Sequence, residues 1–517
     1  MMILDRLTGP DALLQTVFRW HARHRPDALW CEFAGRGYSY AEVDGAANRL
    51  AWALQERHAV RKRDRVAVFM DNCPEYFAAL FGIHRLGAVC VPCSTHCTPA
   101  ELAFQLGHAE VAVAVVDDAN APVFRAAAER VPTPCILAED LDSITGPFPA
   151  SAPPPVDVTP ADLATIMYTS GTTAHPKGVM FSHGNLRVAA ETAVNAFRWG
   201  SADRYLHYFP LSHSNGGLHG VMPAIVAGAT LVMIPKFSAS RFGQQLDEQG
   251  ITFTALNATN VRMLMRHPVT AHDRSHRAWR MMLGLSLGEE EIVAFEERFA
   301  TRLCPTYGLT EGNSIAVIGE PVGPRRLGSA GRVVAGYEVR LPGAVGEAAI
   351  RSSLTHGVTM GYFQDPEQTA EVYRDGWLHT GDVLRADADG YLWFVERAKD
   401  MIKRSGFNVA PAEVERVIEA VPGVRDVVVV GVPDGVREEA VVAFVVTDGP
   451  LAVEDVLEAC RRELAGYKVP GAVHVIGEIP RSVLGKVDRN ALRAAHTAVE
   501  PPSAIRTAPV AGAQLDS

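Results

Sequence analysis

Apolar runs and helical patterns alternate along the first half of the chain. Short apolar runs occur at residues 65–70, 88–93, 111–118 and 229–235, and a helical pattern at 75–87 separates the first two. Buried parallel strands read as continuous apolar runs, and strands that alternate with helices form βαβ units. The pattern therefore predicts an α/β fold built on doubly wound, largely parallel sheets.

The pattern changes after Arg397. A helical pattern at 411–420 is followed by two strand-like runs, at 424–432 and 439–447, and by further helical patterns at 453–464 and after Lys486. This succession predicts a small α+β domain. We expect an N-terminal domain at 1–396, with a smaller β unit beside its α/β sheets, a C-terminal domain at 397–497, and a disordered Pro- and Ala-rich tail at 498–517.

Length, composition and charge narrow the class of protein. The chain has 517 residues, 48% of them hydrophobic and 21% charged, which is typical of a globular protein of several domains. Its net charge is −10 without a basic block, so we expect no nucleic-acid partner. No apolar run of about 18 residues and no basic, apolar N-terminus is present, which predicts a cytoplasmic protein with no membrane partner.

Eight scattered cysteines are too few for a disulfide framework in a chain of this length. Cys90, Cys93, His96 and Cys97 are closely spaced and raise the question of a zinc site. The first two lie in an apolar run, however, and no second ligand pair follows at a usual spacing. We therefore expect buried or loop thiols rather than metal ligands.

A loop dense in hydroxyls and glycines follows the strand-like run at 164–168. Its candidate phosphate ligands are Thr169, Ser170, Gly171, Thr172, Thr173 and Lys177. Hydroxyl and backbone N–H donors can surround phosphate oxygens, while a lysine adds a point charge. The loop is not a Walker loop, because Pro176 precedes Lys177 and Gly178 follows it.

Six segments, in order along the chain, resemble the motifs of the adenylate-forming superfamily, which holds acyl-CoA synthetases, peptide-synthetase adenylation domains and luciferases. The segments are YTSGTTAHPKGV, FPLSHSNG, YGLTE, DGWLHTGD, ERAKDMIKRSGFNVAPAEVE and PRSVLGKVDR. The resemblance implies activation of a carboxylic acid by ATP and Mg²⁺ to acyl-AMP, with release of pyrophosphate. The acyl group would then pass to a thiol, with CoA as the default. A carrier-protein pantetheine arm, or release to a partner enzyme, is the alternative.

The resemblance also assigns roles in nucleotide binding. Tyr307 would stack on adenine, and Glu311, which follows Thr310, would hold Mg²⁺, a cation that prefers carboxylate and phosphate oxygens. Asp382 would accept hydrogen bonds from both ribose hydroxyls, and Arg397 would donate to the same nucleotide. The presence of Glu311, Asp382, Arg397 and Lys486 together disfavours a degenerate, non-catalytic ATP-binding protein.

Two lysines near the C-terminus carry the remaining catalytic expectations. Lys486 resembles the lysine that bridges the acid and the α-phosphate, where its charge would stabilise the transition state. Lys399 resembles the hinge about which the C-terminal lid rotates, with the active site between the two domains. Ala174 departs from the family's usual glycine in the phosphate loop, which puts the motion of that loop in question.

The segment FPLSHSNG and its continuation bear on the acid. His213 resembles the gate of the thiol tunnel, and Ser214 stands where enzymes for α-amino acids place an aspartate. A neutral hydroxyl cannot compensate a buried ammonium, so we expect α-amino acids to be poor substrates. Small residues at Gly216, Gly217 and Gly220 either open the pocket to a bulky, aryl or polycyclic acid or permit tight packing. Other candidate acid-binding residues are Asn215, His219 and Gly284.

The chain also contains a short motif that is typical of a different class of enzyme. The run GLSLG at 284–288 fits the G-x-S-x-G elbow of serine hydrolases, where the superfamily commonly has a Gly-Gly-Ala-Pro-like turn. Ser286, Asp382 and His474 follow one another in the order that such a triad requires. Because this motif is short and recurs by chance, the hydrolase is the weaker hypothesis.

Overall fold

The structure is a computed structural model. It describes residues 12–138, 146, 148–153, 155–169, 176–284, 287–313, 315–397, 400–404, 407–434, 438–464, 466–481 and 486–499. The chain divides into two compact units. The first lies within residues 1–380 and 385–394, and the second within 381–384 and 395–517.

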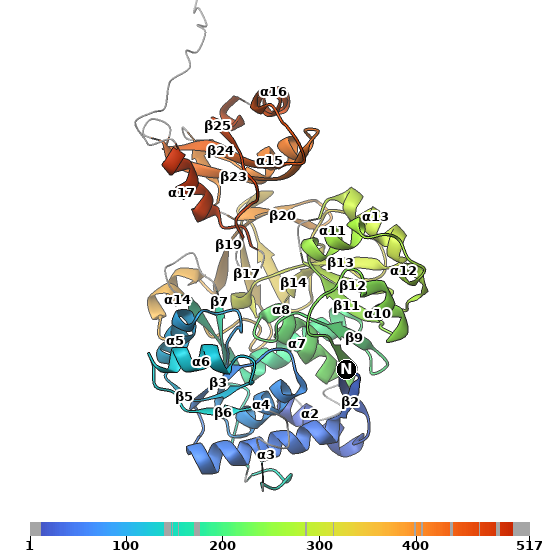
Figure 1. The fold of residues 1–517 in the computed structure, drawn as a ribbon, viewed down its shortest axis with the longest axis vertical. Coiled ribbons are helices and arrows are strands. Elements are labelled where there is room, and N and C mark those ends of the chain that lie inside the picture. The colour runs from blue at the N-terminus through green and yellow to red at the C-terminus, as the bar shows by residue number, and fades with distance from the viewer. Residues whose placement is uncertain are drawn as a thin grey trace, which may run out of the picture. The chain divides into compact units, whose positions relative to one another are not determined.

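A six-stranded sheet with the order β6-β5-β3-β4-β7-β8 forms one half of the first unit (Figure 1). Its strands are β3 (Arg65–Phe69), β4 (Val89–Pro92), β5 (Val111–Val116), β6 (Cys135–Leu137), β7 (Leu163–Thr169) and β8 (Lys177–Ser182). Neighbouring strands are parallel except β7 and β8, which form an antiparallel pair. The apolar runs at 65–70, 88–93 and 111–118 are thus interior strands of this sheet.

A nine-stranded sheet with the order β15-β14-β13-β12-β11-β9-β10-β1-β2 forms the other half. Its strands are β1 (Leu29–Phe33), β2 (Arg36–Ser39), β9 (Arg204–His207), β10 (Thr230–Met233), β11 (Phe253–Leu256), β12 (Arg280–Gly284), β13 (Arg302–Gly308), β14 (Ile315–Ile318) and β15 (Arg332–Val333). The strands from β1 to β13 in this order are parallel, so their carboxyl ends share one edge of the sheet.

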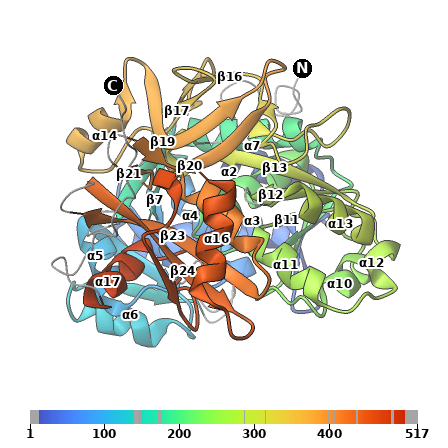
Figure 2. The same ribbon diagram turned by 90° about the horizontal axis from the view of Figure 1, so that it is seen from above.

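Helices separate and flank the two sheets. Between them lie α2 (Leu14–His24), α3 (Tyr40–His58), α4 (Pro74–Arg85), α7 (His183–Phe197) and α9 (Met222–Ala227), which bury Phe18, Leu50, Phe77, Leu186 and Ile225 in one core. The outer helices are α5 (Pro99–His108) and α6 (Ala121–Ala128) on one side, and α10 (Phe242–Glu248), α11 (Ala258–Arg266), α12 (His272–Ser275) and α13 (Glu289–Phe299) on the other. Figures 1 and 2 show these two outer groups on opposite sides of the unit.

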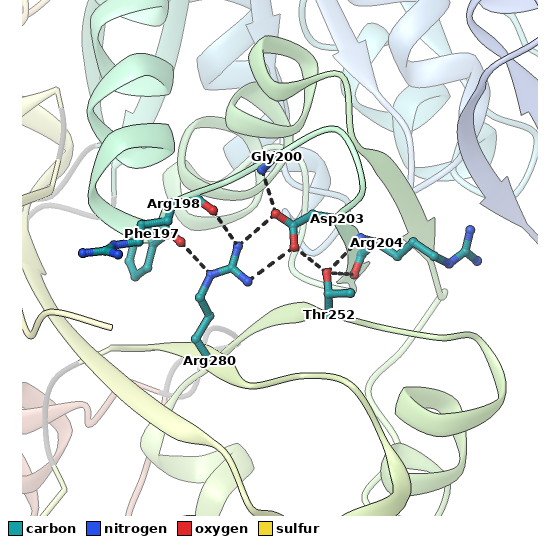
Figure 3. Close-up of polar contacts among 7 residues, drawn as sticks. All are labelled: Phe197, Arg198, Gly200, Asp203, Arg204, Thr252 and Arg280. Carbon is teal, nitrogen blue, oxygen red and sulfur yellow. Dashed lines mark hydrogen bonds and ion pairs between the residues drawn. The ribbon is translucent and has the colours of Figure 1, made fainter. Parts of the chain in front are cut away.

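A buried arginine fixes the end of α7 to the nine-stranded sheet (Figure 3). Arg280, at the start of β12, is 1% exposed and donates from Nε to the carbonyl of Phe197 at 2.6 Å. Its guanidinium also forms an ion pair with Asp203 at 2.9 Å, and Asp203 accepts a hydrogen bond from Thr252 Oγ1 at 2.6 Å. This network positions α7, whose other end lies beside the candidate site.

A smaller antiparallel sheet follows along the chain, as the sequence predicts, and residues 381–384 and 395–397 of this sheet belong to the second unit. It contains β16 (Tyr337–Arg340), β17 (Val345–Ser352), β18 (Tyr373–Arg374), β19 (Trp377–Ala386) and β20 (Leu392–Arg397), of which β20 pairs with β19. The helix α14 (Pro366–Val372) precedes β18. The segment between β17 and α14 carries residues that contact the candidate site.

The second unit is a small α+β body. Its sheet has the order β22-β21-β24-β23, with β25 beside β24, and consists of β21 (Ile402–Arg404), β22 (Phe407–Val409), β23 (Val424–Asp434), β24 (Glu438–Thr447) and β25 (Ala472–Val475). One face packs on α15 (Pro411–Glu419) and α16 (Val453–Glu463), whereas the other buries Leu492 of α17 (Arg489–Val499). Most of the predicted tail, residues 500–517, lies outside the described residues.

The expected fold class is confirmed: two α/β sheet systems, a small β unit and an α+β unit are all present. Cys90 and Cys93 are buried, as the apolar run predicts, and burial raises the pKa of both thiols. None of the helices in the described ranges combines the length and the apolar character that a membrane span requires.

Candidate active site

The antiparallel pair β7 and β8 frames the predicted phosphate loop. Thr169 ends β7 and Lys177 begins β8, and the two residues are register partners across the hairpin. The two predicted ligands that the structure describes are therefore held side by side by sheet hydrogen bonds. Ser170, Gly171, Thr172 and Thr173, and the departure at Ala174, lie outside the described residues.

The predicted adenine and magnesium residues lie at the end of β13 and just after it. Tyr307 is the penultimate residue of that strand, and its ring centroid lies 6.5 Å from that of Phe394. Thr310 and Glu311 lie in the short 3₁₀ turn η2 (Thr310–Gly312). The carboxyl edge of the sheet therefore carries this motif, which is where ligands of open α/β sheets bind.

Three side chains that the sequence interpretation missed hold Glu311. Tyr373 and Thr359 both donate to the backbone carbonyl of Glu311, at 2.7 and 2.8 Å. Tyr362 instead donates its phenolic O–H to the carboxylate oxygen Oε1, at 2.8 Å. The turn and the carboxylate of Glu311 are thus supported by separate tyrosines.

Tyr362 reaches this position because residues 360–363 pair with β8. Met180 donates its N–H to the carbonyl of Gly361 at 2.9 Å, and Phe363 donates to the carbonyl of Gly178 at 2.7 Å. The pairing places the Tyr362 ring under Lys177, whose Nζ lies 5.1 Å from the ring centroid. Burial, followed by the charge of Glu311, raises the pKa of the Tyr362 phenol, so the hydroxyl remains a donor.

The predicted acid-binding segment lies next to the same turn. His213 precedes the short helix α8 (Ser214–Gly216), and its Nδ1 accepts from the backbone N–H of Asn215 at 3.2 Å. The Ser214 hydroxyl lies 3.4 Å from that of Thr310. The fold thus brings the acid motif into contact with the magnesium motif, although the two lie far apart in sequence.

The three glycines of this segment are closely surrounded by other atoms. A Cβ at Gly216 would lie 2.2 Å from the carbonyl oxygen of Pro210, and one at Gly217 would lie 2.9 Å from that of Leu211. At Gly220 it would lie 2.8 Å from the Tyr205 hydroxyl. These contacts favour the tight-packing interpretation, in which the glycines permit close packing of the π-helical turn η1 (Gly217–Val221) and its neighbours. Gly217 also lines a small cavity with Tyr76 and Leu211.

Gly284, by contrast, has space for a side chain beside it. It ends β12 opposite Thr306 of β13, and the nearest atom to a Cβ there would be the Leu256 carbonyl oxygen at 4.0 Å. His219, on η1, is 6% exposed, and its Nε2 has no hydrogen-bond partner among the described residues. Burial, aided by His213, lowers the pKa of His219 to about 4, so this imidazole is neutral at pH 7.

The second unit holds the other predicted residues. Asp382 and Arg397, predicted to bind the same nucleotide, form an ion pair with 2.7 Å between Oδ1 and Nε. Lys486 is exposed and precedes Val487, which forms an antiparallel bridge with Arg481. The hinge candidate Lys399 lies outside the described residues.

The serine hydrolase hypothesis finds no support in these contacts. His474 Nε2 forms a hydrogen bond with Nδ1 of His496 at 2.8 Å, and its ring stacks on Phe444. Asp382 is paired with Arg397. Ser286 lies outside the described residues.

The donor set of the turn fits a magnesium ion. Mg²⁺ is usually held by one or two carboxylates together with substrate phosphates. Glu311 supplies a carboxylate whose rotamer is fixed by Tyr362, and Thr310 supplies a neighbouring hydroxyl. The arrangement can therefore hold a metal–polyphosphate beside Lys177 and present an acid near Ser214.

Similarity to known proteins identifies the family of the chain. Residues 18–363 match the family model described as AMP-binding enzyme, and residues 413–486 match that of the AMP-binding enzyme C-terminal domain. The chain is 35% identical over 489 residues to crotonobetaine/carnitine–CoA ligase of Salmonella typhi, an alignment that covers 90% of this chain and 94% of the relative.

Solved structures of related enzymes align with most of the chain. ATP-bound MatB from Rhodopseudomonas palustris aligns with a TM-score of 0.85 at 27% identity, covering 94% of this chain and all of that one. The o-succinylbenzoate CoA synthetase MenE from Bacillus subtilis, in complex with its acyl-adenylate intermediate, aligns with a TM-score of 0.81 at 26% identity, covering 92% of this chain and 97% of that one. The chain therefore belongs to the AMP-binding enzyme family, within the adenylate-forming superfamily that its motifs resemble.

Proposed function

We propose that the chain is an AMP-forming acid–thiol ligase that activates a carboxylic acid with ATP and transfers the acyl group to CoA. The observation that carries this proposal is the convergence of three motif segments in the first unit. Ser214 lies 3.4 Å from Thr310, and Tyr362 joins Glu311 to Lys177. The CoA ligase named for the relative at 35% identity favours CoA over a carrier protein.

In the first step the carboxylate oxygen attacks the α-phosphorus of ATP. The new C(O)–O–P bond forms as the bond to the β-phosphate oxygen breaks, and pyrophosphate leaves. Lys177 and the hydroxyls of residues 169–173 would bind the phosphates, while Glu311 and Thr310 would hold Mg²⁺, which supplies positive charge against the polyphosphate when bound. Lys486 would stabilise the negative charge that builds between the acid and the α-phosphate.

In the second step the CoA sulfur attacks the acyl carbon. The C–S bond forms, the thiol proton is lost, and the C–O bond to AMP breaks. Tyr307 would hold the adenine, and Asp382 with Arg397 would hold the ribose through both steps. We expect residues 397–497 to act as a lid that rotates about Lys399 relative to residues 1–396, because Lys486 is needed at the α-phosphate in the first step and not in the second.

We further propose that the acid carries no charged group besides its carboxylate. Ser214 and Asn215 are neutral, and the buried His219 is neutral at pH 7, so this segment offers hydrogen bonds but no counter-charge. A buried ammonium would therefore go uncompensated. Open space beside Gly284 leaves room for a larger acyl group there.

Pyrophosphate release across a panel of acids tests the proposal. The panel should hold α-amino acids, short and long aliphatic acids, aryl acids, and the crotonobetaine and carnitine of the relative. We expect acid-dependent formation of AMP and pyrophosphate, and an acyl-CoA product only when CoA is added. Formation of ADP, or no acid-dependent turnover, would overturn the ligase. A preference for crotonobetaine would overturn only the acid class.

A further inference from the structure

Tyr362 lies between two groups of opposite charge. Its hydroxyl donates to Glu311 Oε1 at 2.8 Å, and the ammonium of Lys177 lies over its ring, 5.1 Å from the centroid. The side chain is fixed by its own backbone as well: Tyr362 N donates to Thr369 Oγ1 at 2.9 Å, and the residue bridges to Val179 of β8. One buried phenol thus contacts both the predicted metal ligand and the predicted phosphate ligand.

Such a contact has a chemical consequence for the carboxylate. A carboxylate has two oxygens, and a neutral phenol is a donor to one of them. With Oε1 accepting from Tyr362, the rotamer of Glu311 is set and its second oxygen is the one to meet a cation. Partners of this kind behind a metal ligand commonly change metal affinity about 10–100-fold when they are removed.

The ring has a separate consequence for Lys177. A cation over an aromatic face is attracted by the ring quadrupole, and the attraction strengthens where water is excluded. The ring therefore favours one position of the Lys177 ammonium at the mouth of the phosphate loop. Hydroxyl and ring act on different groups, and different substitutions can separate them.

We propose that Tyr362 is a positioning residue that aligns Glu311 for Mg²⁺ and Lys177 for the phosphates, so that metal and nucleotide bind as one unit. This inference rests on the proposed role of Glu311 as the metal ligand. It predicts that the hydroxyl controls how strongly Mg²⁺ improves ATP binding, and that the ring controls ATP binding even without metal.

The test measures the Kd of ATP by calorimetry in excess Mg²⁺ and in EDTA, and takes the ratio of the two values. Tyr362→Phe keeps the ring and loses the hydroxyl, so the benefit of Mg²⁺ should fall about tenfold, with Kd in EDTA near that of the wild type. Tyr362→Leu should also weaken binding in EDTA. Tyr373→Phe is the matched control, because it removes a hydroxyl from the backbone carbonyl of Glu311, and its Kd ratio should stay unchanged.

Glu311→Gln separates the inference from the proposed function. If the Gln variant retains the full benefit of Mg²⁺, Glu311 is not the metal ligand and the proposed role fails first. If Gln loses the benefit while Tyr362→Phe retains it, the inference alone is overturned. Equal losses in Tyr362→Phe and Tyr373→Phe would indicate general loosening of the turn and also overturn it. Thermal unfolding of each variant checks that it is folded.

Discussion

Lys486 is the residue on which the chemical step depends most directly under the proposed mechanism. Its side chain is exposed, so removing it should leave thermal unfolding unchanged. We expect Lys486→Ala to lower the rate of acyl-AMP formation about 100-fold or more, the scale of losing one preorganised charge-stabilising donor. Acid-dependent exchange of pyrophosphate into ATP measures this step.

The second half-reaction provides the contrast for Lys486. With acyl-AMP supplied directly, the variant should still form acyl-CoA at a rate much closer to that of the wild type. Arg462→Ala removes another exposed positive charge from the same unit and should affect neither step. Equal losses in both half-reactions would contradict the role of Lys486.

Residue identity predicts chemistry well where the chemistry needs a particular functional group. The motifs single out Glu311, Lys177 and Ser214 as candidates. In the structure Tyr362 contacts both Glu311 and Lys177, and Ser214 lies beside Thr310. Tyr362 could not be identified, because its importance arises only when residues 360–363 pair with β8. The role of Gly216 was equally hidden, since a sequence does not show that the Pro210 carbonyl lies where a side chain would go.

At the level of elements, the buried strands and the helices of the second unit were the most predictable. The runs at 65–70 and 111–118 became β3 and β5, and the helical pattern at 453–464 became α16, with ends that differ by at most two residues. A strand that is buried on both faces consists of an unbroken run of apolar residues, which is a strong signal in a sequence. The π-helical turn η1 gives no such signal, because its register depends on packing against Leu211 and Tyr205.

The buried ion pair between Arg280 and Asp203 lies at the C-terminal end of α7. Removing this ion pair tests how much it contributes to stability. Arg280→Met would remove the guanidinium donor from the Phe197 carbonyl and the positive charge from the Asp203 carboxylate, which would keep its hydrogen bonds from Thr252 Oγ1 and Gly200 N (Figure 3). Breaking a buried pair by removing one partner costs about 3–5 kcal/mol. We expect a loss of this size in the free energy of unfolding of the first unit, measured by urea denaturation.

Arg198 provides the matched control, because it lies at the same helix end but its side chain is exposed. Arg198→Met should change the free energy of unfolding by no more than about 0.5 kcal/mol. Asp203→Asn should destabilise as well, since it leaves the Arg280 charge uncompensated, and the two changes should not be additive. A small effect of Arg280→Met would show that the network is not what anchors α7.

At the scale of the whole first unit, buried neutral histidines make stability depend on pH. His84, His183, His207 and His219 are each at most 6% exposed. Burial lowers the pKa of His183 and His219 to about 4, that of His207 to about 3, and that of His84 well below its usual value. In the unfolded chain these side chains bind protons at pH values below about 6.5.

The unfolded state therefore binds more protons than the folded state between about pH 6.5 and pH 4, and stability must fall as the pH falls through this range. Each such histidine contributes a slope of up to about 1.4 kcal/mol per pH unit. Urea denaturation of the first unit at pH 7, 6 and 5 should show a loss that steepens below pH 6.5. An asparagine does not titrate in this pH range, so His183→Asn should reduce the slope of the free energy of unfolding against pH by about the contribution of one histidine. Replacing the exposed His96 with asparagine should leave this slope unchanged. A slope that is flat between pH 6 and 5, or unchanged in His183→Asn, would mean that these histidines are not held neutral by the fold.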